Sequence, residues 1–244
     1  MHQTRLNDAA IALDRVLSKA GVKFGIFGGY SITVLGGQRE SKDIDCVASV
    51  NKQQIISVMN GKEGFVAVPQ GRQDYVAFIW SDQPNRQNAV FVEIFCEQFP
   101  GMSKLCPKRP SCLICSTGYR HTMQDLHMNE VAITGQALGN GRSSFLDPVD
   151  IFKEKLHAAA TRAKFHDLAD LRWLETRYGA QIQERRGKLK LDYVGLALKR
   201  YPELTILFAR IGVDINGARY AARNLDPNKI PAPAPGDVQQ GLLG

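Results

Sequence analysis

Apolar positions follow two kinds of spacing over the first 145 residues. Residues 5–20 carry apolar side chains at helical spacing, with Asp8 and Asp14 on the opposite face, which predicts an amphipathic helix. Residues 52–59 predict another helix, and a short apolar segment at 30–35 is helix-like. Short runs rich in β-branched and aromatic residues predict strands at 22–27, 43–47, 65–68, 75–80, 89–97 and 127–134.

The remainder of the chain has a different pattern. The glycine-rich stretch 135–144 is interpreted as a flexible loop, and Asp147-Pro148 has the form of a helix start. Helical spacing then dominates up to residue 224. The order of elements predicts an α+β fold, with a mixed sheet and flanking helices over 1–145, a small helical lobe over 146–225, and a disordered proline-rich tail over 226–244.

The strand at 43–47 carries two carboxylates. Because side chains alternate along a strand, Asp43 and Asp45 share one face while Ile44 and Cys46 point into the core. Two neighbouring carboxylates repel each other unless a cation lies between them, and Mg²⁺ prefers oxygen ligands. The pattern therefore predicts a magnesium site.

Two further features point to phosphate chemistry. Gly28-Gly29 lies at a strand-to-helix turn, where the absence of Cβ atoms lets backbone N–H groups approach a phosphate. Glu93 lies in the middle of an apolar strand, where a carboxylate is costly unless it is paired or bound to metal. The other interpretation is that Glu93 faces solvent on a one-sided sheet; Glu97 is a weaker rival for the role.

These motifs resemble the signature of the DNA polymerase β-like nucleotidyltransferase superfamily: a Gly-Gly turn, a short helix, and Asp-x-Asp on the next strand. The spacing from Arg39 to Asp43 is similar to the Arg-x-Thr-x-Asp variant of minimal nucleotidyltransferases and AbiEii-type toxin proteins, with Ser41 in place of threonine. This likeness covers about the first two thirds of the chain. The segment Asp150–Leu174 resembles the helix pair that follows such cores.

The resemblance implies a site of acidic and basic residues. Asp43, Asp45 and Glu93 would hold two Mg²⁺ ions and perform catalysis. The implied nucleotide-binding residues are Gly28, Gly29, Ser31, Arg39, Lys155, Arg162, Lys164 and Asp167. An alternative for the last four is an ordinary charged helical surface with ion pairs, in which Asp167 and Asp170 accompany the cations.

The implied activity is Mg²⁺-dependent transfer of a nucleoside monophosphate from a nucleoside triphosphate. A small molecule, a protein or a tRNA are all compatible acceptors, because the fold does not set the substrate. The alternative is a nucleotide- or nucleic-acid-binding protein that has kept the fold and lost turnover.

Composition adds three expectations. The net charge of +7 favours polyanionic partners or simply solubility. No signal peptide or membrane-length apolar run is visible, so a cytoplasmic protein is expected. The five cysteines are expected to be reduced thiols, with a structural zinc site at Cys106, Cys112, Cys115 and His121 as the alternative, which would make the chain a zinc-stabilised interaction protein.

Overall fold

The computed structural model describes residues 3–72, 74–96 and 126–229. Two compact units meet in sequence at Asp147 and Pro148, the first containing the sheet and the second built of helices. The cysteines and histidine proposed for zinc lie outside the described residues, as does the tail from residue 230. None of the described helices has the length and apolar character needed to cross a membrane.

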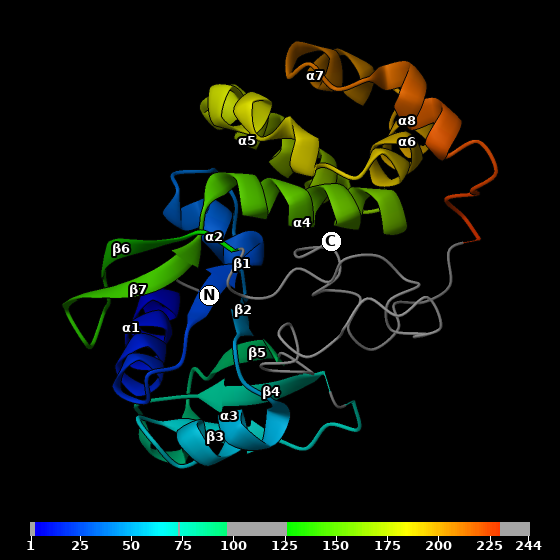
Figure 1. The fold of residues 1–244 in the computed structure, drawn as a ribbon. Coiled ribbons are helices and arrows are strands. Elements are labelled where there is room, and N and C mark those ends of the chain that lie inside the picture. Colours follow the sequence, from blue (N-terminus) through cyan, green and yellow to red (C-terminus); the bar gives the residue numbers. More distant parts are fainter. Residues whose placement is uncertain (1–2, 73, 97–125, 230–244) are drawn as a thin grey trace. The chain divides into compact units, whose positions relative to one another are not determined.

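The first unit is organised around a seven-stranded mixed sheet, in the order β3-β4-β5-β2-β1-β7-β6 (Figure 1). The strands are β1 (Phe24–Phe27), β2 (Asp43–Ala48), β3 (Phe65–Val68), β4 (Tyr75–Trp80), β5 (Val90–Cys96), β6 (Met128–Thr134) and β7 (Asn140–Leu146). β2 pairs in parallel with β5, as does β1 with β7, and the remaining pairs are antiparallel. The α+β fold predicted from the sequence is confirmed.

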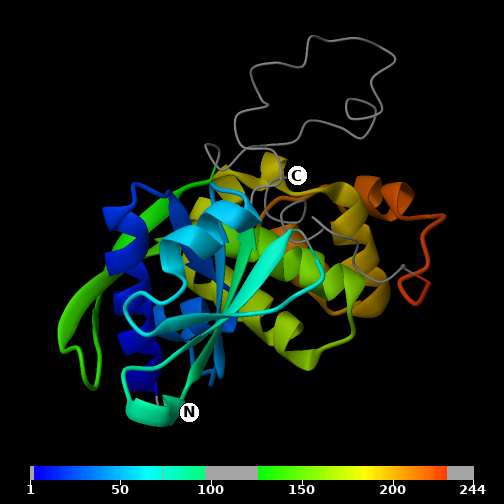
Figure 2. The same ribbon diagram turned by 90° about the horizontal axis from the view of Figure 1, so that it is seen from below.

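The helices of this unit are α1 (Gln3–Lys19), α2 (Gly28–Val34), α3 (Lys52–Met59) and a short 3₁₀ turn, η1 (Pro84–Arg86). The start of α3 is fixed by a capping box, in which the Asn51 side chain accepts from the Gln54 N–H and the Gln54 side chain accepts in return. α1 and α3 share one hydrophobic core with alternate residues of the strands, and this core covers one face of the sheet (Figure 2). The opposite face of β2, β5 and β4 presents the other set of alternating side chains.

Two sequence expectations were wrong in this unit. The stretch 135–144 is not a flexible loop throughout: β7 begins at Asn140 and pairs with β6 over seven residues. Its first five residues, Asn-Gly-Arg-Ser-Ser, are polar or glycine, and its buried apolar side chains, Phe145 and Leu146, come only at its end.

The second wrong expectation concerns α1. Asp8, expected on the solvent face, is fully buried. Its carboxylate accepts hydrogen bonds from the N–H groups of Ala137 (3.0 Å) and Leu138 (2.8 Å). It therefore anchors the turn between β6 and β7 to α1.

The second unit contains α4 (Pro148–Thr161), α5 (Phe165–Glu184), the 3₁₀ turn η4 (Arg186–Lys188), α6 (Leu191–Arg200), α7 (Leu204–Arg210) and α8 (Ile215–Ala221). The break between α4 and α5 falls at 162–164, where the sequence indicated a bend. Phe152 and Phe208 meet edge to face with ring centroids 6.5 Å apart. α6 and α8 pack closely because Gly195 has no side chain: a Cβ there would lie 2.1 Å from the Ala218 carbonyl oxygen.

Candidate active site

The ladder between β2 and β5 brings the sequence-distant carboxylates together. Asp45 is directly opposite Glu93 in this parallel pair, and on its other side Asp45 is opposite Phe27 of β1. Residues that are directly opposite in a ladder point to the same face of the sheet, and residues two apart on one strand do so as well. Asp43, Asp45 and Glu93 therefore lie on one face. Glu93 does not face away from the aspartates.

The opposite face confirms the alternation predicted for β2. Ile44 and Cys46 are completely buried and belong to the core beneath α1 and α3, together with Val92 and Ile94 of β5. All three acidic residues of the site are partly buried. The carboxylates are thus set at the boundary between protein and solvent, where a ligand can reach them.

The electrostatics of the cluster are visible at Glu93. Burial raises the pKa of its carboxyl above the ordinary value, and the nearby negative charge of Asp43 raises it further, while Arg72 acts in the opposite direction. Ser41 donates a hydrogen bond to Oδ1 of Asp43 at 3.1 Å, so the serine hydroxyl does orient this carboxylate. A positive charge bound between the carboxylates would reduce their mutual repulsion and stabilise this arrangement.

The Gly-Gly turn lies directly against this cluster. Gly28 has a φ of +75°, and a Cβ built on it would be only 2.1 Å from Oδ2 of Asp45. A Cβ on Gly29 would lie 3.0 Å from the guanidinium of Arg39. The backbone leading to Arg39 is held by Thr33, whose hydroxyl donates to the Arg39 carbonyl at 2.7 Å. The turn consequently places one carboxylate and one guanidinium beside the first residues of α2.

Ser31 lies in α2 next to the Gly-Gly turn. Its side chain is completely buried, and its hydroxyl donates to the carbonyl oxygen of Gly28 at 2.8 Å. This bond stabilises the turn. The contact of Ser31 with a phosphate stays a prediction.

The basic residues expected from the second resemblance lie in the helical unit. Lys155 is buried, with Nζ 3.5 Å from Oδ2 of Asp170 and 3.2 Å from Oε2 of Glu154. Arg162 makes two hydrogen bonds to the buried carboxylate of Asp167, at 2.8 and 2.9 Å. Each aspartate thus accompanies one cation, as both interpretations of this segment require.

Lys164 has an exposed side chain, whereas its backbone carbonyl is engaged by the N–H of Asp167 at 3.1 Å. It is the N-cap residue of α5, in extended conformation. Of the three cations expected to meet phosphate, Arg162 and Lys164 are therefore exposed and Lys155 is buried.

Sequence reasoning missed Arg72, which lies between the strands predicted at 65–68 and 75–80. Its guanidinium binds the buried carboxylate of Asp74 in bidentate fashion, at 2.9 and 2.5 Å. Lys52 donates to the backbone carbonyls of Gln70 and Arg72, which fixes the loop. The Arg-x-Asp spacing immediately before an apolar strand was the available signal, but its relation to Glu93 depends on the pairing of β4 with β5.

The fold defined by this sheet and its helices is nucleotidyltransferase-like. Among solved structures, the chain is similar to an antigenic nucleotidyltransferase-like protein from Paracoccidioides brasiliensis, with a TM-score of 0.51 and 16% sequence identity. The match covers 84% of this chain and 93% of the other. No family model matches the sequence, and no curated protein does. At this identity the likeness concerns the fold.

Proposed function

We propose that this protein is a Mg²⁺-dependent nucleotidyltransferase that moves a nucleoside monophosphate from a nucleoside triphosphate to an acceptor. The observation that carries the proposal is the register of β2 against β5, in which Asp45 and Glu93 are opposite each other and Asp43 shares their face. The Gly28 turn beside Asp45 adds a place where backbone can approach a ligand closely. The distant structural neighbour supports the fold on which this chemistry is usually built.

The donor set fits a hard divalent cation. Three carboxylates share one face, and burial together with Asp43 raises the pKa of Glu93, which indicates negative charge that is incompletely neutralised. Asp43, Asp45 and Glu93 would hold the metal. Bound Mg²⁺ supplies charge neutralisation for the triphosphate and its pyrophosphate leaving group.

The chain's own residues account for the remaining roles. The backbone of Gly28 and Gly29 binds phosphate oxygens, and Arg39, which lies over Gly29, neutralises part of their charge. Glu93 accepts the proton of the attacking hydroxyl, because its carboxylate lies on the same face as those of Asp43 and Asp45. Catalysis rests mainly on positioning and electrostatics.

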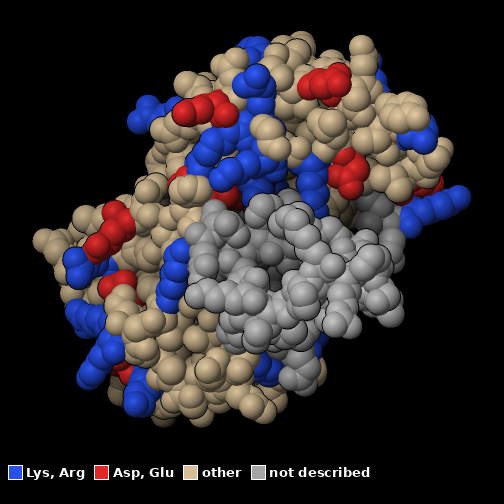
Figure 3. Space-filling view, in the orientation of Figure 1, with Lys and Arg blue, Asp and Glu red and all other residues tan. Residues whose placement is uncertain are grey.

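In the helical unit, Arg162 and Lys164 supply phosphate contacts, with Asp167 orienting Arg162. Contact of Lys155 with the triphosphate remains a prediction. Residues 148–229 contain 16 Lys and Arg against 10 Asp and Glu, a net charge of +6. Figure 3 shows basic side chains gathered on one face of these helices. This charge favours an anionic nucleotide near the helical unit.

Within the superfamily, we propose the minimal nucleotidyltransferase and AbiEii-like branch. The support is the Arg39-x-Ser41-x-Asp43 spacing and the placement of its members: Arg39 lies at the Gly-Gly turn, and Ser41 donates to Asp43.

A labelling experiment tests the proposal. Purified protein with Mg²⁺ and α-labelled triphosphates is expected to transfer label to an acceptor, and Asp43→Asn with Asp45→Asn is expected to abolish transfer. The control is Asp14→Asn, on the far helix α1. Undiminished labelling by the double variant would overturn the assignment.

Binding without turnover is the competing function. Calorimetric titration of triphosphate with and without Mg²⁺ separates the two, because a binding protein gives heat but no labelled product. The common face of Glu93 and the aspartates favours chemistry over binding alone.

A further inference from the structure

A second set of side chains extends away from the carboxylates along the same face. Four residues are mutually opposite across β2, β5, β4 and β3: Asp43 pairs with Phe91, Phe91 with Ile79, and Ile79 with Val66. Since opposite residues share a face, the apolar strip Phe91–Ile79–Val66 lies on the carboxylate face and begins beside Asp43.

The strip is accessible to a ligand. Phe91 is 38% exposed although it lies on a central strand, and Ile79 and Val66 are partly buried. Their neighbours on the other face, such as Val92 and Phe78, are completely buried. Phe91 thus presents an exposed aromatic ring directly opposite Asp43, where a ligand bound at the carboxylates can contact it.

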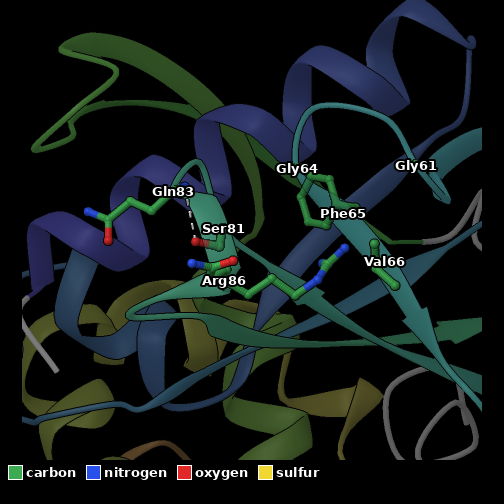
Figure 4. A pocket seen from close by; sticks show the side chains of 8 residues that line it. Gly61, Gly64, Phe65, Val66, Ser81, Gln83 and Arg86 are labelled. Carbon is green, nitrogen blue, oxygen red and sulfur yellow. Dashed lines mark hydrogen bonds between the residues drawn. The ribbon is translucent and has the colours of Figure 1, made fainter.

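The outer end of the strip is polar. Val66 also lines a cavity of about 300 Å³ with Ser81, Gln83 and Arg86. Figure 4 shows the Arg86 side chain extending towards Val66 along the edge of the sheet. Adjacent strands are about 4.8 Å apart, so Val66 lies roughly 14 Å from Asp43. This length suits a molecule of one or two rings.

The charge of the strip restricts the ligand. Phe91, Ile79 and Val66 carry no charge. Arg72, the cation that acts on Glu93, is already bound to Asp74. A nucleic-acid strand needs cations along its backbone, so this path favours an uncharged ligand.

We propose that the strip is the acceptor subsite, and that the acceptor is a small hydroxylated molecule with a flat apolar face. The face lies on Phe91 and Ile79, and this directs the hydroxyl towards Asp43 and Glu93. Polar substituents at the far end reach the cavity near Arg86. This inference rests on the proposed function and names the substrate class of that site.

The test uses simple probes with the full-length protein. Saturation-transfer NMR measures contact of 2-phenylethanol and of ethanol, in the presence of Mg²⁺ and tripolyphosphate. The ring protons of 2-phenylethanol are expected to receive saturation, with affinity falling about 5-fold or more in Phe91→Ala and less in Phe91→Leu. Tyr220→Ala, an exposed aromatic in the helical unit, is the matched control and is expected to behave like the wild type.

Each other outcome is decisive. Equal ring saturation in the wild type and Phe91→Ala overturns the proposal, as does contact with ethanol equal to that with 2-phenylethanol. Phe91-dependent binding of a ten-residue oligouridylate that displaces 2-phenylethanol overturns it in favour of nucleic acid. Calorimetry of Mg²⁺–tripolyphosphate on the same samples tests the proposed function separately. If the protein does not bind Mg²⁺–tripolyphosphate but the ring protons of 2-phenylethanol still receive saturation, the proposed nucleotidyl transfer is refuted, and the strip remains a site that binds an aromatic ring.

Discussion

Substitution of Gly28 by alanine probes the contact between the Gly-Gly turn and Asp45. The new Cβ would lie 2.1 Å from Oδ2 of Asp45, well inside van der Waals contact, so the carboxylate has to move. In addition, φ of +75° is left-handed and costs an alanine roughly 1–2 kcal/mol. We expect Gly28→Ala to lower the free energy of unfolding by more than this backbone cost, because the Asp45 carboxylate is also displaced. The variant should also weaken Mg²⁺–triphosphate binding by about 10-fold or more.

Gly21 provides the matched control. Its φ is +67°, and a Cβ there would meet nothing within 4 Å. Gly21→Ala therefore isolates the backbone cost, and is expected to lose roughly 1–2 kcal/mol in urea unfolding while keeping wild-type nucleotide affinity. Both variants are measured by urea denaturation and by calorimetric titration with Mg²⁺ and triphosphate.

A double-mutant cycle tests the clash without reference to function. In an Asp45→Ala background the displaced carboxylate is gone, so Gly28→Ala is expected to cost little more than Gly21→Ala. If Gly28→Ala costs the same in both backgrounds, the two residues are not in contact. If Gly28→Ala binds Mg²⁺–triphosphate with unchanged affinity, the turn has no part in the nucleotide site.

Three further outcomes are expected. Asp8→Ala removes the buried carboxylate that accepts from the N–H groups of Ala137 and Leu138, and should lower the free energy of unfolding by about 1–3 kcal/mol, against less than about 1 kcal/mol for Asp14→Ala, both measured in urea. Glu93→Gln should stabilise the metal-free protein at pH 7.5. Because the pKa of Glu93 is raised in the folded state, its ionisation opposes folding, so the wild type should lose stability as the pH rises above about 4.5 and the variant should not. Unfolding in EDTA at a series of pH values is the check, and equal pH dependence of the two proteins would refute this. Lys155→Met removes the ammonium that lies 3.5 Å from the buried carboxylate of Asp170 and should lower the free energy of unfolding by roughly 3 kcal/mol, and adding Asp170→Leu should restore part of it, with thermal unfolding as the check.

Local patterns were sufficient for most of the sheet unit. Alternation placed Asp43 and Asp45 on one face because a strand's geometry fixes the direction of successive side chains, and the structure has this face. Helical spacing located α3 at Lys52–Met59. The same local logic indicated that Glu93 was unusual, but only its pairing with Asp45 decided which face it occupies.

Features that depend on contacts between distant segments were not predictable in this way. Asp8 belongs to the polar set of its helix, and its burial follows from the β6–β7 turn, 129 residues further on. Arg72 acts on Glu93 only because the sheet brings its loop close.

The parallel pairing of β2 with β5 has a consequence for tolerance to insertion. The separation between Asp45 and Glu93 is set by interstrand hydrogen bonding, while the chain that joins them runs through α3, β3, β4 and the exposed turn at 82–88. Extra residues spliced into that turn would lengthen the route without moving either endpoint. The spacing between Asp45 and Glu93 therefore does not depend on the length of this loop, and residues 82–88 offer a position where a reporter peptide can be inserted with the acidic trio left intact.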